Sequence, residues 1–247
     1  MSLQNFNLHD LKEKVDPQAL IDLFNSLTDE EAALLQYQWS FWARRQQLPP
    51  SLKSTTSWLT WLILAGRGFG KTRSGAEWVR DIVENHNYKR IALVAQDAAD
   101  ARDVMVEGES GLMAVCPPWN RPHYEPSKRR LTWPNGARAT IYSADDPESL
   151  RGPQHDAAWL DELCKWRYQD EVWHQLQLGL RLGRRPIQCI TTTPKPQQLL
   201  KEIIKRRSTI ITKGHTYDNL DNLAPSFREE ITSLYEGTRL GRQELSA

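Results

Sequence analysis

One stretch, "WLTWLILAGRGFGKTRSGAEWV" at residues 58–79, restricts the folds open to this chain more than any other. It begins with an uninterrupted apolar run of the kind that forms a strand buried on both faces of a sheet. A glycine-rich loop follows, and a Lys-Thr pair then opens a pattern whose apolar residues share one helical face: Ala76, Val79, Ile82 and Val83. The stretch therefore predicts a buried strand joined by a short loop to an amphipathic helix.

The rest of the chain repeats this alternation of strand and helix. Further buried strands are expected in "RIALVAQ", "DAAWLDEL", "PIQCITTTP" and "STIITKG", and "RRLTWPNGARATIYSA" is typical of a hairpin around Asn135-Gly136. Helices are expected in "AADARDVMVEG" after an Asp97 cap, in "DEVWHQLQLGLRLG" up to Gly183, in "QQLLKEIIKRR" and in "APSFREEITSLYEG". Alternation of this kind predicts the α/β class with a mainly parallel sheet.

The first 50 residues differ from the rest and predict a helical segment. Asp16 is an N-cap before Pro17, and Thr28 with Glu31 forms a capping-box pattern before "AALLQYQWSFWARR". The stretch "QQLPPSLKSTTS" is typical of a linker. We therefore expect a helical segment at 1–50 and an α/β domain at 51–247.

Composition excludes several classes of protein. The formal net charge is +1, so any nucleic-acid surface must be local. No run approaches the ~20 apolar residues of a membrane span, and the N-terminus lacks an apolar signal core, so we expect an intracellular protein with no membrane partner. The three cysteines lack CxxC spacing and are expected to be reduced and buried, and most of the ten tryptophans are expected to anchor the core.

A glycine loop between a strand and a Lys-Thr helix start is a phosphate-binding element. Glycines let backbone N–H groups turn toward phosphates, and the helix N-terminus adds unpaired donors. Lys71 can reach the β- and γ-phosphates, and the Thr72 hydroxyl can ligate Mg²⁺. The pattern G-x-x-x-x-G-K-[ST] has glycine where this chain has Ala65. We expect ATP to be held by Gly66, Arg67, Gly68, Phe69, Gly70, Lys71, Thr72 and Arg73.

An acidic pair ends the apolar stretch "AAWLDEL". Asp161 is expected to hold Mg²⁺, directly or through water, together with Thr72, and Glu162 is expected to act as the general base that orients the attacking water. Acids commonly end strands, so the pair gains its weight from the glycine loop upstream. The added glutamate favours a hydrolytic motor over kinases and switch GTPases.

Two further features have both a functional and a structural interpretation. Thr191, Thr192 and Thr193 end a buried strand, where hydroxyls can sense a γ-phosphate or merely reflect β-propensity. Arg151 precedes a Gly-Pro turn, where a displayed guanidinium can act as an arginine finger or form an ordinary surface ion pair.

Taken together, these residues resemble the large terminase subunit of tailed bacteriophages, an ATP-driven DNA-packaging motor. "LAGRGFGKTRSGAEWV", "VMVEGESGL", "WPNGARATIYSADDPESLRGP", "WLDELCKW", "TTTPKP" and "YEGTRLGRQEL" follow the family pattern in order. Gene-transfer-agent and prophage copies share this pattern.

The resemblance implies a RecA-like, additional-strand P-loop ATPase and assigns roles to individual residues. Lys71 and Thr72 match Walker A, Asp161 and Glu162 match Walker B, and Thr191–Thr193 match the coupling motif. Arg151 matches a trans-acting arginine finger, and Arg67 matches an arginine that addresses the phosphates. The family's adenine-reading glutamine corresponds to Gln47, with Gln36 and Gln38 as alternatives.

The resemblance also implies partners and a setting. Expected partners are double-stranded DNA, the portal protein of a procapsid, the small terminase subunit and further copies of the chain in a ring, although the isolated domain can be monomeric. The expected location is the host cytoplasm, docked transiently on the procapsid. Family members continue into an RNase H-like nuclease domain, for which no suitable acidic cluster is expected here, so no nuclease activity is expected of this chain.

Three basic clusters are candidates for gripping DNA phosphates: Lys128, Arg129 and Arg130; Arg181, Arg184 and Arg185; and Lys201, Lys205, Arg206 and Arg207. Each is equally open to interpretation as a solvated face. Two rival functions are a helicase-like nucleic-acid translocase and a nucleotide-binding regulatory module without turnover. Procapsid-dependent packaging would exclude the first, and phosphate release would exclude the second.

Overall fold

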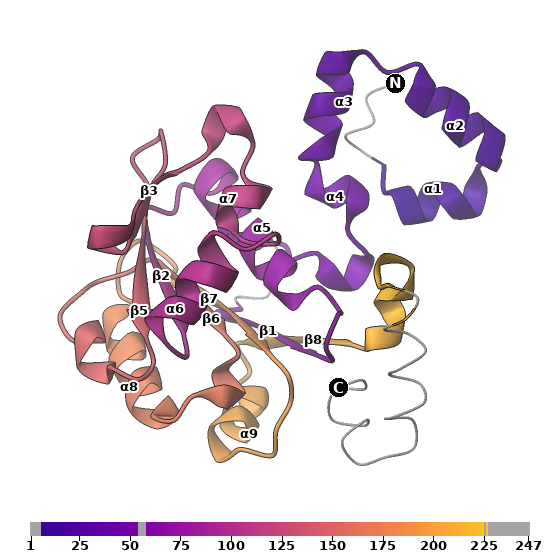
Figure 1. Ribbon diagram of the computed structural model, residues 1–247. Helices are drawn as coiled ribbons and strands as arrows, with labels where there is room; N and C mark the ends of the chain where they lie inside the picture. The colour runs from indigo at the N-terminus through magenta and orange to yellow at the C-terminus, as the bar shows by residue number, and fades with distance from the viewer. Residues whose placement is uncertain (1–5, 54–57, 225, 227–247) are drawn as a thin grey trace. The chain divides into compact units, whose positions relative to one another are not determined.

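The computed structural model of the protein describes residues 6–53, 58–224 and 226 (Figure 1). The chain divides into two compact units, Met1–Leu48 and Pro49–Ala247. The expected last helix and the "YEGTRLGRQEL" stretch lie almost entirely outside the described residues. No helix among the described residues has the length and apolar character needed to cross a membrane.

The first unit is helical, as predicted. It contains helices α1 (Leu8–Lys14), α2 (Pro17–Asn25), α3 (Asp29–Gln36) and α4 (Trp39–Trp42), followed by a 3₁₀ turn (Arg45–Gln47). Both predicted caps are confirmed: the Asp16 carboxylate accepts from the backbone of Gln18, and Thr28 and Glu31 form a capping box.

The prediction of one continuous helix over residues 32–45 was wrong. Helix α3 ends at Gln36, and the Trp42 indole N–H donates to the last-turn carbonyl of Leu35 at 2.6 Å. The break lets α4 turn Phe41 inward, whereas Trp42 remains 38% exposed. Phe41 is fully buried, and Phe24 of α2 contacts both Phe41 and Trp42. Aromatic packing thus prevails over helix propensity here.

The second unit is built on an eight-stranded sheet with the order β3-β4-β5-β2-β6-β7-β1-β8. Strands β5, β2, β6, β7, β1 and β8 are parallel, and β3 and β4 are antiparallel additions at one edge. The strands are β1 (Thr60–Ala65), β2 (Arg90–Ala95), β3 (His123–Glu125), β4 (Arg130–Thr132), β5 (Arg138–Ser143), β6 (Ala157–Asp161), β7 (Ile187–Thr192) and β8 (Thr209–Gly214). The predicted mainly parallel α/β class is confirmed.

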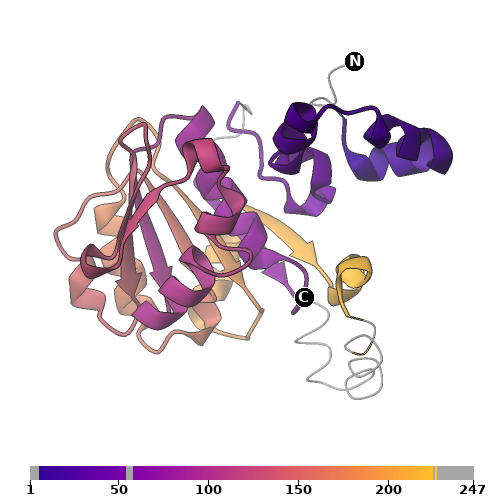
Figure 2. The same cartoon turned by 45° about the horizontal axis from the view of Figure 1, so that its top comes forward.

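Helices cover both faces of this sheet, as Figures 1 and 2 show. One face packs against α5 (Lys71–Asn85), α7 (Leu112–Val115) and a π-helical segment (Ala101–Val106) that continues α6 (Ala98–Asp100). The other face packs against α8 (Gln169–Gly179) and α9 (Gln198–Lys205). Alternate strand residues serve the two cores, so the strands are apolar without alternation.

Tryptophans anchor this core, and the cysteines are buried thiols. Trp58, Trp61, Trp78, Trp133, Trp159 and Trp173 are among the largest fully buried side chains. Cys116, Cys164 and Cys189 are free and buried. Both expectations are confirmed.

Three details differ from the sequence prediction. Helix α8 ends at Gly179 rather than near Gly183. The backbone N–H of His155 donates to the Gly179 carbonyl, and Leu180 then forms a β-bridge with His155, which takes the chain out of the helix. The segment after Asp97 becomes π-helical from Ala101 onward. The short edge strand β3 was not predicted.

The strand order places the predicted site residues at one edge of the sheet. Strand β7 lies between β1 and β6, so an additional strand separates the glycine-loop strand from the strand that carries the acidic pair. Because these three strands are parallel, their carboxyl ends meet at the same edge, where ligands of open α/β sheets bind.

Candidate functional site

The glycine loop joins β1, which ends at Ala65, to α5, which begins at Lys71. Gly68 and Gly70 have φ values of 73° and 95°, a region that residues with a Cβ rarely adopt. Gly70 is the N-cap of α5 and makes no side-chain cap. The N-terminal N–H groups of α5 therefore point toward space in which an anion can bind.

The segment after β8 holds this loop from outside. Thr216 donates to the Arg67 carbonyl at 2.6 Å, and Asn219 donates to the Gly68 carbonyl at 2.5 Å. The Phe69 ring is fully buried and lies so close to Gly214 that an added Cβ there would come within 2.2 Å of it. Sequence analysis missed this support, because no motif joins residues about 150 positions apart.

The position of Phe69 limits its predicted role in holding ATP. Its side chain belongs to the core, so only its backbone can address a nucleotide. Gly66 is also buried, and its carbonyl accepts from Lys71. Both residues thus shape the loop.

Lys71 is buried, and oxygen atoms surround its ammonium. The Nζ atom donates to the carbonyls of Ala65 at 3.0 Å and Gly66 at 3.1 Å, and to Thr193 Oγ1 at 3.0 Å. It also lies 3.5 Å from Glu162 Oε1. Burial lowers the pKa of Lys71, and the nearby carboxylate of Glu162 opposes that shift.

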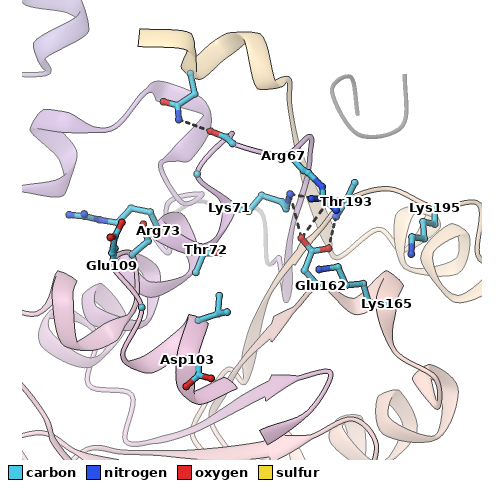
Figure 3. Close-up of a pocket in the computed structure, with 16 residues that line it drawn as sticks. Arg67, Lys71, Thr72, Arg73, Asp103, Glu109, Glu162, Lys165, Thr193 and Lys195 are labelled. Atoms are coloured by element: carbon cyan, nitrogen blue, oxygen red, sulfur yellow. Dashed lines mark hydrogen bonds and ion pairs between the residues drawn. The ribbon is translucent and has the colours of Figure 1, made fainter. Parts of the chain in front are cut away.

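Glu162 is held in a backbone conformation unusual for a residue with a side chain. Its φ is 51° and its ψ is 45°, and its N–H donates to the Thr191 carbonyl at 2.6 Å. The backbone N–H of Thr193 donates to Glu162 Oε2 at 3.2 Å, and the Thr193 hydroxyl donates to Oε1 at 3.4 Å. Left-handed residues of this kind cluster at functional sites. Figure 3 shows Lys71, Glu162 and Thr193 converging.

Asp161 lies beside this group in the chain, and its side chain is buried. Its Oδ1 accepts from the Thr191 hydroxyl at 2.6 Å, and the same hydroxyl accepts from the Trp159 indole at 2.9 Å. Burial raises the pKa of Asp161 to about 6. The Trp159 ring in turn lies against α5, where an added Cβ at Gly75 would come within 2.3 Å of it. Packing of α5 on β6 therefore sets the distance between the glycine loop and the acidic pair.

The loop and the acidic pair border an open cleft of about 680 Å³, within the size range of small-molecule sites. One wall comes from the glycine loop and the start of α5, and another from the ends of β6 and β7. A third wall comes from the π-helical segment and the turn after it. The lining residues are Arg67, Gly68, Gly70, Lys71, Thr72, Arg73, Asp103, Val104, Gly108, Glu109, Ser110, Glu162, Lys165, Thr193, Lys195 and Asn219.

Several of these lining residues were not predicted. Asp103, Val104, Glu109 and Ser110 lie in or next to "VMVEGESGL", which entered the sequence analysis only as part of a family resemblance. Lys165 and Lys195 closely follow predicted motif residues and were given no role. Their nearness to the acidic pair and to the threonines was the signal that could have identified them.

The donor set fits a magnesium ion that also binds phosphate. Thr72 lines the cleft, whereas Asp161 is buried and is not among the described lining residues, although the Glu162 that follows it is. The described residues contain no group of three or more His, Cys, Asp or Glu able to hold a metal by themselves. Mg²⁺ usually takes one or two protein oxygens together with substrate phosphates and water. A cation would also offset the cost of ionising the buried Asp161 carboxyl.

The structure does not bring every predicted residue into the cleft. Arg67 and Arg73 line it, and Arg73 also pairs with Glu77 at 2.8 Å. Arg151 is not among the described residues that line it: its side chain is 73% exposed and lies 3.4 Å from Glu148. Gln47 belongs to the helical unit, where its Oε1 accepts from the Arg44 backbone at 3.2 Å.

Some candidate DNA-gripping residues have structural roles instead. Arg185 donates to the Trp58 carbonyl at 2.6 Å and stacks on its ring, and Arg206 lies over the Trp173 ring. Lys128 and Arg130 pair with Glu125 at 2.7 and 2.8 Å. The exposed candidates with no ion pair found among the described residues are Arg129, Arg181, Arg184, Lys201, Lys205 and Arg207.

Comparisons with known proteins agree with this geometry. Residues 62–247 match the family described as "Terminase large subunit, T4likevirus-type, N-terminal". The large terminase ATPase domain of Thermus phage P74-26 is 17% identical with a TM-score of 0.62, over 88% of this chain and 96% of that chain. A large terminase from a thermophilic bacteriophage, in complex with ATP-gamma-S, is 13% identical with a TM-score of 0.60, over 86% of this chain and 51% of that chain. A comparison with curated proteins finds no match. At these identities the solved structures establish the fold.

Proposed function

This chain belongs to the family of phage large terminase subunits, and from that premise we propose that it hydrolyses ATP to move double-stranded DNA into a procapsid. We place the hydrolytic site in the α/β domain, residues 51–247, with the helical segment 1–50 as an accessory. The large terminase of the thermophilic bacteriophage has been solved with ADP and with ATP-gamma-S, which supports a nucleotide as the ligand of the cleft.

The observation that carries the proposal is the junction of Lys71, Glu162 and Thr193 at the mouth of the glycine loop. A cation able to bind phosphate, an acid able to activate water and a hydroxyl from a third strand meet within 3.5 Å of one another. A binding module without turnover needs the cation and the loop but has no use for the acid. The acid therefore favours hydrolysis.

ATP would lie along the loop, with its phosphates on the backbone N–H groups of residues 66–72. Lys71 would exchange its protein oxygens for the β- and γ-phosphates, and this exchange would release Glu162 from the 3.5 Å ion pair. Glu162 would then orient a water for attack on the γ-phosphorus. A Mg²⁺ held by Thr72 and Asp161 would neutralise charge on the phosphates.

We propose that Arg151 completes the site of a neighbouring subunit. Its exposed side chain lies outside the described lining of the cleft in its own chain, and the ion pair that it forms with Glu148 joins two exposed groups and is therefore weak. An arginine finger supplied by another copy needs such a displayed side chain. This role requires a ring of subunits during packaging.

For DNA we propose the edge of the sheet opposite the cleft. Arg90 and Arg138 begin the neighbouring strands β2 and β5 and are paired in register, an arrangement of like charges that is unfavourable by itself. Exposed Arg181, Arg184 and Arg207 precede β7 and β8 at the same edge. The nearby Asp156 carboxylate is occupied by the backbone N–H groups of Lys89 and Arg90. Binding of DNA phosphates here would be independent of sequence and sensitive to salt.

The same proposal includes the family's packaging partners. During packaging the chain would contact the portal protein and the small terminase subunit, in the host cytoplasm on a docked procapsid. Procapsid-dependent DNA uptake would distinguish packaging from a helicase-like activity.

The first test is ATP hydrolysis by the chain and by Glu162→Gln, measured as phosphate release over a range of protein concentrations. We expect the variant to bind ATP and to lose about 10²–10⁴-fold in rate. Wild-type activity should rise more steeply than linearly with concentration, because neighbouring subunits complete the site. Equal rates for the two proteins would refute hydrolysis at this cleft.

The DNA surface is tested by the salt dependence of DNA binding. The double variant Arg90→Gln/Arg138→Gln should reduce the slope of log K against log salt by about 1–2. The control is Lys128→Gln, because this lysine is already paired with Glu125. An unchanged slope in the double variant would exclude this edge.

A further inference from the structure

Two lysines on the strand-end wall of the cleft are not used by the mechanism above. Lys165 ends a short 3₁₀ turn (Leu163–Lys165) directly after the acidic pair, and Lys195 follows the threonines that end β7. Both line the cleft, Lys165 with an exposed side chain and Lys195 with a half-buried one. No ion pair within 4.0 Å involves either of them in the described part of the chain.

The segments that carry these lysines are bonded to each other. The backbone N–H of Cys164 donates to Thr192 Oγ1 at 3.0 Å, and its carbonyl accepts from Gln197 Nε2 at 3.0 Å. Residue 164 immediately precedes one lysine, while 192 and 197 flank the other. The two ammonium groups therefore extend from one fixed platform at the end of the sheet.

The charges of this platform act on the catalytic group. Burial is the main influence on the pKa values of Asp161 and Lys71. The positive charge of Lys165 lowers both pKa values, so the Lys165 ammonium lies within electrostatic range of Asp161 and Lys71. Figure 3 shows Lys165 beside Glu162 and Lys195 farther along the same wall. The Glu162 carboxylate is already engaged by Lys71 and Thr193. Within the described part of the chain, the two platform cations thus face the cleft without an acidic partner.

The position of the platform indicates which part of a nucleotide it faces. In the proposed function the glycine loop would bind the phosphates from the α5 side, and the base that orients the attacking water must lie next to the terminal phosphate. That base is Glu162, and Lys165 is three residues from it on the same turn. The diphosphate portion of a bound nucleotide would lie closer to the loop and farther from the platform.

We propose that Lys165 and Lys195 bind the terminal phosphate of the nucleotide and make the cleft prefer a triphosphate to a diphosphate. The inference rests on the proposed nucleotide hydrolysis and adds a residue-level basis for product release. Loss of the γ-phosphate removes the anion that the platform binds, so ADP is held by the glycine loop alone.

The test is the ratio of affinities for ATP-gamma-S and ADP, measured by calorimetry with Mg²⁺. Lys165→Gln, Lys195→Gln and the double variant keep most of the side-chain length and remove the charge. Each lost charged contact to phosphate costs about one factor of ten, so we expect each single variant to bind ATP-gamma-S about 10-fold more weakly and the double variant about 100-fold more weakly. Binding of ADP should stay within about twofold of wild type. Lys165→Arg should restore part of the ratio, and Lys201→Gln on α9, outside the described lining of the cleft, is the matched control.

The outcomes separate this inference from the function on which it rests. An unchanged ratio, or an equal loss for both nucleotides, overturns the platform while leaving nucleotide binding intact. A loss of DNA affinity at an unchanged ratio would assign the lysines to DNA and also overturn it. A wild-type chain that binds neither nucleotide overturns the proposed function together with the inference.

Discussion

The two sides of the cleft present their cations in opposite ways. On the loop side, Lys71 is 8% exposed and bonded to three protein oxygens, with Glu162 at 3.5 Å. On the strand-end side, Lys165 is exposed and Lys195 half-buried, and neither forms an ion pair with the described residues. One side already satisfies its own charge, whereas the other can satisfy its charge only with a ligand.

This difference separates two kinds of function. We call a cation self-bonded when protein oxygens already bind it, as they bind Lys71. Such a cation must exchange partners when a ligand binds, so ligand binding at the loop side can change the protein around Lys71. A displayed group can only add contacts, so it serves selectivity or assembly. Arg151, which lies outside the described lining of the cleft, resembles the displayed kind in its exposure, although it also forms an exposed ion pair with Glu148.

Substitution of Arg151 is expected to have the largest effect on ATP turnover, and it tests the distinction between self-bonded and displayed cations most strongly. In an assembled ring, Arg151→Ala should lower ATP turnover by about 10³–10⁵-fold, because transition-state charge loses its guanidinium. Mixing inactive Arg151→Ala with inactive Glu162→Gln should restore part of the activity, since some interfaces then contain both intact residues. Phosphate release by the mixture, compared with each variant alone, is the measurement. If assembled mixtures stay inactive, Arg151 does not act between subunits.

Lys71→Ala tests the self-bonded side. We expect a loss of about 10²–10³-fold in turnover, the usual cost of removing one preorganised electrostatic group. Affinity should fall for ATP-gamma-S and ADP alike, since the loop contacts both. Calorimetry on the two nucleotides distinguishes this uniform loss from the selective loss expected at Lys165 and Lys195. A selective loss at Lys71 would remove the distinction between the two sides.

The self-bonded side was the more predictable from sequence, for a physical reason. A phosphate loop needs glycines at positive φ, a lysine and a hydroxyl at fixed spacing, so its chemistry is local and visible in "GRGFGKT". Buried parallel strands are equally local signals, and β1, β2, β6, β7 and β8 all lie where the apolar runs predicted them.

What sequence analysis missed depends on contacts between distant segments. Thr216 and Asn219 reach the loop across about 150 residues, and the π-helical wall has no sequence signature of its own. Helix α8 ended early because of a bridge to His155, which no local pattern encodes. Lys165 and Lys195 were visible as residues, but their lack of acidic partners among the described residues became apparent only in three dimensions.

Substitution of Asp161 is expected to give the next largest effect, which is measured on the free energy of unfolding. The pKa of its carboxyl is raised by burial from 3.8 to about 6, so between these values the folded state binds more protons than the unfolded state. Stability should therefore fall as pH rises from about 4 to 6, and Asp161→Asn, which carries no charge, should be more stable than wild type by about 1–3 kcal/mol at pH 8.

At pH 4 this advantage should nearly vanish, because the folded wild-type carboxyl is then protonated. Urea unfolding without Mg²⁺ at both pH values measures the difference. An advantage of equal size at pH 4 and pH 8 would show that the effect comes from packing rather than from the buried charge.

The smallest expected effect concerns the external support of the glycine loop. Thr216→Val keeps the shape of a buried side chain and removes the hydrogen bond to the Arg67 carbonyl. We expect a loss of about 1–2 kcal/mol in the free energy of unfolding, because the hydrogen bond from residue 216 to the carbonyl is lost. Thr209→Val on β8 is the matched control, since the buried Thr209 hydroxyl finds no hydrogen-bond partner within the described part of the chain. That control should be neutral or stabilising. If the two variants lose equal stability, the hydrogen bond from residue 216 does not hold the loop, and the loop's shape then depends on its own glycines and on Phe69.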